Sequence, residues 1–239
     1  MTLLPTVSPD LRDAGSNSFL LRHVQTLGIA LGEMDYLRGH KDDFFGDQIA
    51  DQYTSVANGV GSFVVLLDAV HGGAVSLTSG PGVGRFAQLW LGDAADGHDS
   101  LSADPGYVII GYHALSDGGN ISGRVGVSNA AKDRYLLVGA DTAVGGNWYL
   151  WCRAGALPAG LTTVDSGIAI DTDYHWHVID VYPTSTGRRA DYYLDGAPVA
   201  TSITNIEAAA FVRTPFVECL SPGAWMRAVA LNYWAAIPR

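Results

Sequence analysis

The sequence is poor in lysine and glutamate, the two residues that usually fill the exposed surfaces of helices. Among 239 residues there are only two lysines, Lys41 and Lys132, and three glutamates, Glu33, Glu207 and Glu218. Because these residues are good helix formers at solvent-facing positions, their scarcity argues against a helical protein. The 29 glycines and 10 prolines instead favour many short strands joined by turns.

Cysteine is equally scarce, since Cys152 and Cys219 are the only two in the chain. Two cysteines in a chain of this length do not make a disulfide framework. Each lies in a strand-like run, at 148–153 and 215–220, so we expect buried thiols. A single bridge between two strands stays open, because the sequence does not give the distance between the sulfur atoms.

Positive charge is also in short supply, with 14 Lys and Arg against 24 Asp and Glu, which gives a formal net charge of −10. A nucleic-acid-binding protein needs a positive face to displace counterions from phosphate, so we expect no nucleic acid as partner. Anionic membranes are disfavoured for the same reason. No signal peptide and no apolar run of membrane-spanning length are present, so we expect a soluble protein made in the cytoplasm.

The patterns of several enzyme classes are missing. Retaining glycosidases on β-sandwiches need two close carboxylates on one strand face, but the three glutamates are isolated in the sequence. Asp171 and Asp173 are two residues apart, but an aspartate side chain is short for reaching a glycosidic bond. No Gly-x-Ser-x-Gly occurs, and Ser79 precedes a glycine-rich turn without the lysine of a phosphate loop. We predict no enzyme, no catalytic residue and no cofactor, and keep a glycoside hydrolase with an atypical site as a third reading.

What is present is a series of strand-like runs separated by turn residues. The expected strands are 62–69, 74–78, 85–91, 107–114, 121–127, 134–140, 147–153, 161–170, 174–182, 188–194, 197–201, 214–220 and 226–234. Such close spacing without alternating helical patterns predicts an all-β sandwich or barrel. Within it, 183–187 reads as a turn, and Asp195-Gly196 predicts a type I′ hairpin because glycine tolerates positive φ.

The first 41 residues differ from the rest of the chain. Pro5 and Pro9 indicate an extended arm, and residues 18–34 form an apolar block that fits either a helix or one or two strands. We therefore divide the chain into an N-terminal arm at 1–41 and a sandwich at 42–239. The arm is either an edge element packed on the sandwich or an attachment segment that grips a partner.

Three stretches carry a resemblance to a known family. The run Tyr174–Tyr182 with Asp191–Ala200 resembles the late hairpin of concanavalin A-like jelly-roll domains, which carry a Trp-His strand and then a strand ending in Asp-Gly. The segments Asp42–Asp47 and His71–Gly80 resemble the opening strands of versions found in tailed-phage virion proteins. The resemblance covers roughly 42–239 and implies a concanavalin A-like jelly-roll β-sandwich with a short N-terminal arm.

The same resemblance implies a function. It points to a capsid decoration (cement) protein on the outer surface of a phage head, with the major capsid protein as partner and a homotrimer as the assembly. The alternative is a carbohydrate-binding module or tail-fibre domain that contacts host glycans.

Two groups of residues suggest metal binding. His175 and His177 project from one strand face with Asp171 and Asp173 upstream, a set that suits zinc. We expect instead that His177 is hydrogen-bonded in the core. The loop at 92–99 holds three aspartates that suit calcium, but their spacing is not that of an EF-hand, and we predict no metal site.

Aromatic residues are numerous enough for a glycan-binding platform. The candidates are Trp148, Trp151, Trp176, Tyr192 and Tyr193. Most rings in a sandwich belong to its core, and two residues that are three apart, such as Trp148 and Trp151, do not share a strand face without a bulge. The platform is therefore kept as an alternative to a purely structural role.

Overall fold

The computed structural model describes residues 40–42, 53–67, 74–91, 106–206, 214–224 and 226–238. They form fifteen strands: β1 His40–Asp42, β2 Tyr53–Asn58, β3 Phe63–Leu67, β4 Ala74–Ser79, β5 Arg85–Leu91, β6 Tyr107–Leu115, β7 Ser122–Ser128, β8 Tyr135–Asp141, β9 Asn147–Arg153, β10 Leu161–Ala169, β11 His175–Thr184, β12 Gly187–Leu194, β13 Ala197–Ser202, β14 Thr214–Ser221 and β15 Arg227–Pro238. Within these ranges no helix has the length and apolar character needed to cross a bilayer.

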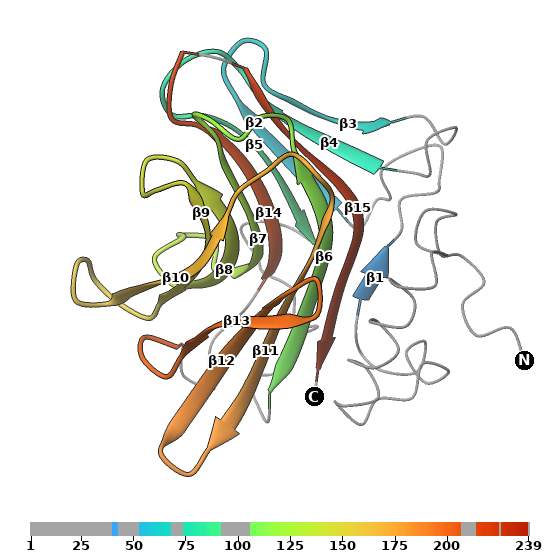
Figure 1. Ribbon diagram of the computed structural model, residues 1–239. Helices are drawn as coiled ribbons and strands as arrows, with labels where there is room; N and C mark the ends of the chain where they lie inside the picture. The colour runs from blue at the N-terminus through green and yellow to red at the C-terminus, as the bar shows by residue number, and fades with distance from the viewer. Residues whose placement is uncertain are drawn as a thin grey trace, which may run out of the picture.

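The strands build two antiparallel sheets that pack face to face (Figure 1). The eight-stranded sheet has the order β13-β12-β11-β6-β15-β4-β3, with β1 beside β15, and the seven-stranded sheet has the order β10-β9-β8-β7-β14-β5-β2. Every strand pair in both sheets is antiparallel, so the all-β sandwich prediction is confirmed.

The core lies between the sheets and follows the period-two alternation of the strands. In β5, Ala87 and Leu89 point into the core, whereas Gln88 and Trp90 point outward. Trp148 from the seven-stranded sheet and Trp234 from the eight-stranded sheet are the largest side chains in this core, and both are fully buried. Glycine or alanine faces bulky neighbours where the sheets come close, as at Gly123, where a Cβ would lie 2.5 Å from Leu115.

Two local features differ from the sequence prediction. Strand β2 was not predicted, because its outward positions are largely polar. Pro183 was predicted to lie in a turn, but β11 continues through it to Thr184. The pairing of β11 with β6 ends at Val181, so the missing N–H of Pro183 interrupts no ladder on that side.

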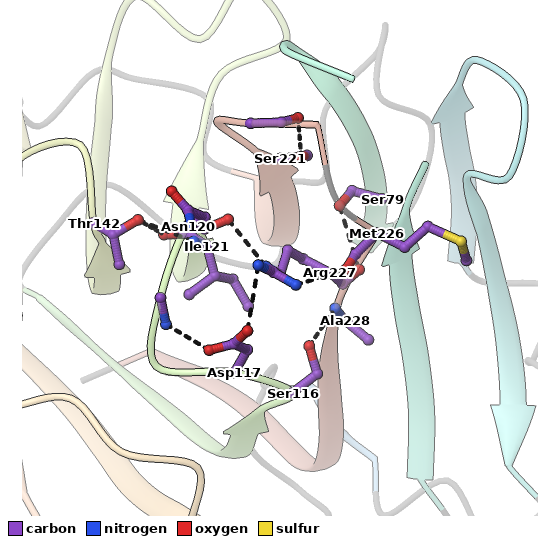
Figure 2. Close-up of polar contacts among 12 residues, drawn as sticks. Ser79, Ser116, Asp117, Asn120, Ile121, Thr142, Ser221, Met226, Arg227 and Ala228 are labelled. Atoms are coloured by element: carbon purple, nitrogen blue, oxygen red, sulfur yellow. Dashed lines mark hydrogen bonds and ion pairs between the residues drawn. The ribbon is translucent and has the colours of Figure 1, made fainter. Parts of the chain in front are cut away.

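One end of the sandwich is fixed by a network around Arg227 (Figure 2). Its guanidinium lies 3.3 Å from Asp117 Oδ2 and donates to the carbonyl of Asn120, so it holds the β6–β7 connection. The Arg227 carbonyl accepts a hydrogen bond from Ser79 on β4, and Ala228 N–H donates to Ser116 Oγ. The start of β15 is thereby tied to both of its neighbours in the sheet.

The expected boundary between arm and sandwich falls at the first described strand. The short strand β1 pairs with β15 from Ala236 to Trp234. The rest of the expected arm, residues 1–39, lies outside the described residues, so its role stays a prediction.

The hairpin between β12 and β13 has the predicted type I′ character, since Asp195 has φ 48° and Gly196 has φ 87°. Gly196→Val should strain this turn by about 1–2 kcal/mol, because a β-branched residue is disfavoured at positive φ. We expect the melting temperature to fall by about 2–6 °C for a chain of this size.

Gly146→Val is the matched control, since a Cβ at Gly146 meets no atom within 4 Å and its φ lies outside the left-handed region. Equal melting temperatures for the two variants would show that positive φ at Gly196 costs nothing.

Candidate functional site

The outer face of the seven-stranded sheet carries a second cluster of buried apolar side chains, most of them aromatic, separate from the core between the sheets. Its members are Trp90, Leu137, Tyr149, Trp151 and Phe216. The rings of Trp90 and Phe216 lie 4.4 Å apart between centroids, and those of Tyr149 and Trp151 lie 5.5 Å apart. None of the five is more than 5% exposed, although each points away from the opposite sheet. We call this cluster the aromatic floor.

A carboxylate from strand β14 lies on this floor. Glu218 Oε2 accepts hydrogen bonds from Gln88 Nε2 at 2.6 Å and from Lys132 Nζ at 2.7 Å, and Glu218 is only 6% exposed. Gln88 in turn accepts a hydrogen bond from Trp90 Nε1 at 3.2 Å. This second bond fixes which end of the Gln88 amide faces Glu218, so the carboxylate is held in one orientation.

Arg124 on β7 lies between two carboxylates. It donates to Asp141 Oδ2 on β8, and its Nη1 lies 4.0 Å from Glu218 Oε1. The guanidinium carbon is 5.0 Å from the centre of the Trp151 ring, within cation–π range. The guanidinium of Arg124 therefore lies over the Trp151 ring of the floor and between the carboxylates of Asp141 and Glu218.

Lys132 is the most accessible charged group of this layer, with 35% of its side chain exposed. It lies in the β7–β8 connection with φ 51°, a conformation that costs energy for a residue with a Cβ. Asn129 holds the connection, because its side chain accepts hydrogen bonds from the N–H groups of Asp133 and Arg134. Lys132 Nζ also lies 5.2 Å from the ring centres of Phe86 and Phe216.

These residues together form what we call the Glu218 site. Its members are Gln88, Trp90, Arg124, Lys132, Asp141, Trp151, Phe216 and Glu218. The site offers ionic donors and acceptors above aromatic rings, which suits a polyhydroxylated ligand. A retaining glycosidase needs two carboxylates facing across a sugar, but here Arg124 lies between them. The arrangement therefore favours binding over hydrolysis.

The four residues that the sequence suggested for metal binding do not converge on one point. His177 points into the core, where it is 1% exposed and its Nδ1 lies 2.8 Å from Tyr192 Oη. This confirms the expected hydrogen bond in the core. Asp173 instead donates its backbone N–H to Asp171 in the connection before β11. Across the described segments, no group of three or more His, Cys, Asp or Glu side chains could hold a metal ion. The loop at 92–99 lies outside them.

His175 forms a clasp with two aspartates instead. Its Nδ1 lies 2.5 Å from Asp195 and its Nε2 lies 2.8 Å from Asp171. The hydrogen bond to Asp195, aided by the one to Asp171, outweighs burial and raises the pKa of His175 to about 9. Although burial opposes it, the hydrogen bonds from His175 and from the Asp173 backbone lower the pKa of Asp171. The clasp ties the β12–β13 turn to the start of β11.

Two further imidazoles are stacked beneath this clasp. The rings of His113 and His177 lie 4.0 Å apart between centroids, and Trp148 meets His177 edge-on at 4.7 Å. Burial, with a smaller effect from the charge of His175, lowers the pKa of His113 to about 3. Burial also lowers the pKa of His177 well below its usual value. Both rings are therefore neutral in the folded protein near pH 7.

The five aromatic candidates do not make one platform, so the alternative of a platform built from all five is not supported. Trp148 and Tyr192 lie in the core, and Trp176 stacks on Tyr112, which it faces across the ladder on the outer face of the eight-stranded sheet. Of the five, Trp151 belongs to the Glu218 site. As the strand period requires, Trp148 and Trp151 point to opposite faces of β9.

The two cysteines are buried and form no disulfide with each other. Cys152 lies on β9 and Cys219 on β14, with β8 and β7 between them in the sheet. Burial raises the pKa of Cys219 to about 11, so this thiol is protonated and inert near neutral pH. The expected buried thiols are therefore confirmed.

Sequence reasoning missed most of the Glu218 site. Glu218 was noted only as an isolated glutamate, and Gln88 only as a residue of an expected strand. Arg124 and Asp141 were not singled out. Their one signal is that each is a polar residue at a buried, outward-facing position of a strand.

Comparisons with known proteins identify the fold. No family model and no curated protein matches the chain. Among solved structures, the carbohydrate recognition domain of Emp47p superimposes with a TM-score of 0.56 at 9% identity, covering 84% of this chain and 94% of that one. A prokaryotic β-1,3-1,4-glucanase (lichenase) from a mouse hindgut metagenome gives 0.56 at 11% identity, covering 84% and 99%. The β-glucanase of Bacillus licheniformis gives 0.55 at 11% identity, covering 84% and 98%.

These structures confirm the concanavalin A-like jelly-roll sandwich. At such low identity they establish the fold alone, which enzymes share with a carbohydrate recognition domain, so enzymatic activity is not indicated. No structure compared here links the chain to phage virion proteins.

Proposed function

We propose that this chain is a carbohydrate-binding domain that holds a glycan at the Glu218 site. The observation that carries the proposal is the layer of Arg124, Lys132 and Glu218, held by hydrogen bonds and ion pairs above buried aromatic rings. Sugar hydroxyl groups both donate and accept hydrogen bonds, and they suit a site that presents fixed donors and acceptors side by side.

The positions of the two cations support one way of holding such a ligand. Arg124 lies over Trp151 and Lys132 over Phe216, so hydroxyl groups would meet these cations before the rings, while the partly exposed Phe86 offers an apolar edge beside Lys132. Because these side chains are already fixed by partners within the protein, little rotamer entropy is lost on binding. The similarity to the carbohydrate recognition domain and to the two glucanases supports a carbohydrate as the ligand.

The capsid-decoration function stays a prediction without support from the comparisons. The same holds for the virion location, the major capsid protein as partner and the homotrimer. The alternative made from the sequence, a carbohydrate-binding module or tail-fibre domain, agrees better with the Glu218 site and with the structural neighbours.

The proposal is tested by screening the full chain on a glycan array and measuring the affinity for the best glycan by calorimetry. Lys132→Met should weaken binding at least tenfold, because it removes the most accessible cation of the site, and a factor of ten corresponds to about 1.4 kcal/mol. We also expect no reducing ends to be released from that glycan or from β-glucans.

Arg189→Met is the matched control. Arg189 carries the same charge, but it pairs with Asp191 on β12 of the other sheet. Its removal should leave the affinity unchanged. Binding that is insensitive to Lys132→Met, or no binding to any glycan, would contradict the proposal.

A further inference from the structure

Strand β3 is the edge of the eight-stranded sheet, and among the described residues it pairs only with β4. Its side chains alternate along the strand. Val64 and Leu66 pack against the core, whereas Phe63 and Val65 on the outer face are 43% and 41% exposed. An edge of this kind presents unpaired backbone N–H and C=O groups beside apolar side chains.

The other described edges carry features that discourage pairing. Strand β13 contains Pro198 and a register shift against β12, and β10 has a register shift after Asp165 with φ 72° at Gly167. The short strand β1 reads His-Lys-Asp and is charged, and three of the six residues of β2, Tyr-Thr-Ser-Val-Ala-Asn, are polar. Strand β3 reads Phe-Val-Val-Leu-Leu, has no charge, proline or glycine, and pairs with β4 without a shift. It is the one described edge that is open to another strand.

The exposed apolar side chains of the molecule gather around this edge. Val60, Phe63, Val65, Val83 and Met226 make up five of the ten large apolar side chains that are exposed in the described part of the chain. The turns that bear Val60 and Val83 are joined, since Gly80 N–H donates to Ser62 Oγ at 2.7 Å. Figure 2 shows Met226 pointing away from the Arg227 network that fixes its backbone.

The charge distribution indicates what covers this surface. Two copies of a chain with a net charge of −10 repel each other over most of their surfaces. Residues 53–67 and 74–91, which hold β2 to β5, contain a single charged residue, Arg85. The β3 edge is therefore a place where a second copy approaches with little electrostatic cost.

We propose that β3 pairs antiparallel with β3 of a second copy, joining the two eight-stranded sheets into one continuous sheet. The strand is self-complementary: a two-fold axis at Val65 places Val64 opposite Leu66 and Phe63 opposite Leu67, so every cross-strand pair is apolar. Such an axis is perpendicular to the sheet, so both copies keep the same face outward.

The pairing has a consequence for binding that rests on the proposed function. Because the two-fold axis leaves the faces unchanged, the outer faces of both seven-stranded sheets point to the same side of the dimer. Two Glu218 sites are then presented together, and a surface that displays many glycans is bound with avidity beyond that of one site.

Light scattering on the full chain at about 100 μM without glycan tests the pairing independently of any ligand. We expect a mass of about 50.6 kDa, twice the 25.3 kDa of one chain. Val65→Lys should give the 25.3 kDa of a folded monomer, because it places like charges directly opposite each other across the axis. Val144→Lys, at an exposed apolar position in the β8–β9 connection, should leave the dimer intact.

Amide hydrogen exchange gives a second measurement that needs no variant. Protection of the β3 amides should rise with protein concentration, while protection of the β10 edge should stay constant. A monomer or a trimer of the unaltered chain would overturn the proposal, as would a dimer that survives Val65→Lys. A dimer that binds no glycan would leave the pairing standing and contradict the proposed function alone.

Discussion

Acidification from pH 7 to pH 4.5 should lower the free energy of unfolding by about 2.5 kcal/mol through His113 alone, because the folded protein excludes a proton from this core histidine, and His177 adds to the loss in the same direction. His113 and His177 are stacked at 4.0 Å between ring centroids and are at most 1% exposed. Neither nitrogen of His113 has a hydrogen-bond partner among the described residues. A proton on either ring would be a buried charge next to a second imidazole.

The direction follows from the pKa values. The pKa of His113 is lowered to about 3 and that of His177 lies well below 6.5, so below pH 6.5 the unfolded chain binds protons at both histidines more readily than the folded chain does. The stabilisation that comes from keeping these histidines neutral is therefore complete above pH 6.5. It is lost as pH falls, by about 1.4 kcal/mol per pH unit for each histidine that stays neutral in the folded protein. His175, with its pKa raised to about 9, has the opposite pH dependence. Its contribution to the free energy of unfolding is complete below pH 6.5 and is lost as pH rises through 9.

Urea unfolding measured between pH 7 and 4.5 gives this slope directly. The unaltered chain should show proton uptake on unfolding, and His113→Phe should reduce this uptake by about one proton. His175→Gln is the control, since His175 is charged in both the folded and the unfolded chain below about pH 5.5, so its loss should leave the slope in that range unchanged. A free energy of unfolding that stays flat down to pH 4.5 would show that the two rings are not buried as a neutral pair.

Arg124→Met should destabilise the fold by about 3 kcal/mol, the second large effect that we expect. Arg124 Nη1 lies 4.0 Å from Glu218 and Nη2 donates to Asp141, and both carboxylates are less than 10% exposed. Without the guanidinium, two nearly buried negative charges face each other, and Asp141 loses its cation. Methionine keeps most of the apolar contact with Trp151, so the change isolates the charge.

Arg153→Met is the matched control on the same sheet face. Arg153 donates to the carbonyls of Gly155 and Lys132 rather than to a carboxylate, so its loss should cost only about 1 kcal/mol. Adding Asp141→Asn to Arg124→Met should restore part of the lost stability. Equal costs for the two arginines in urea unfolding, or no restoration by Asp141→Asn, would mean that Arg124 does not balance the two carboxylates.

The fold was predictable because strand alternation and turn residues are local signals. The runs at 85–91 and 147–153 became strands with those bounds, and Asp195-Gly196 took the expected turn. Strand β2 escaped prediction because an edge strand with polar outward positions resembles a loop. The turn predicted at Pro183 was wrong for a related reason. Only the observed pairing shows that β6 ends before Pro183, so that the proline needs no hydrogen-bond partner on that side.

The site was not predictable, because it is assembled by strand order. Gln88, Arg124 and Glu218 come from three strands that are distant in the sequence and become neighbours only because β14 lies between β5 and β7. Each strand contributes a single residue to this group, which gives no motif along the sequence. The pair His175 and His177 shows the converse. Their spacing correctly predicted that both rings lie on one face of β11. Whether each ring lies at the surface or in the core depends on its partner, Asp195 for His175 and Tyr192 for His177, and the sequence does not show these partners.

The most direct test of the account is a titration of the fluorotryptophan-labelled chain with the best glycan from the array, followed by ¹⁹F NMR. The six tryptophans include Trp90 and Trp151 in the Glu218 site, Trp148 and Trp234 in the core, and Trp176 on the opposite sheet. We expect the resonances of Trp90 and Trp151 to shift in a saturable way while those of Trp148 and Trp234 stay in place. Saturable shifts at Trp176 alone, with Trp90 and Trp151 unmoved, would place the ligand on the other sheet and contradict the account.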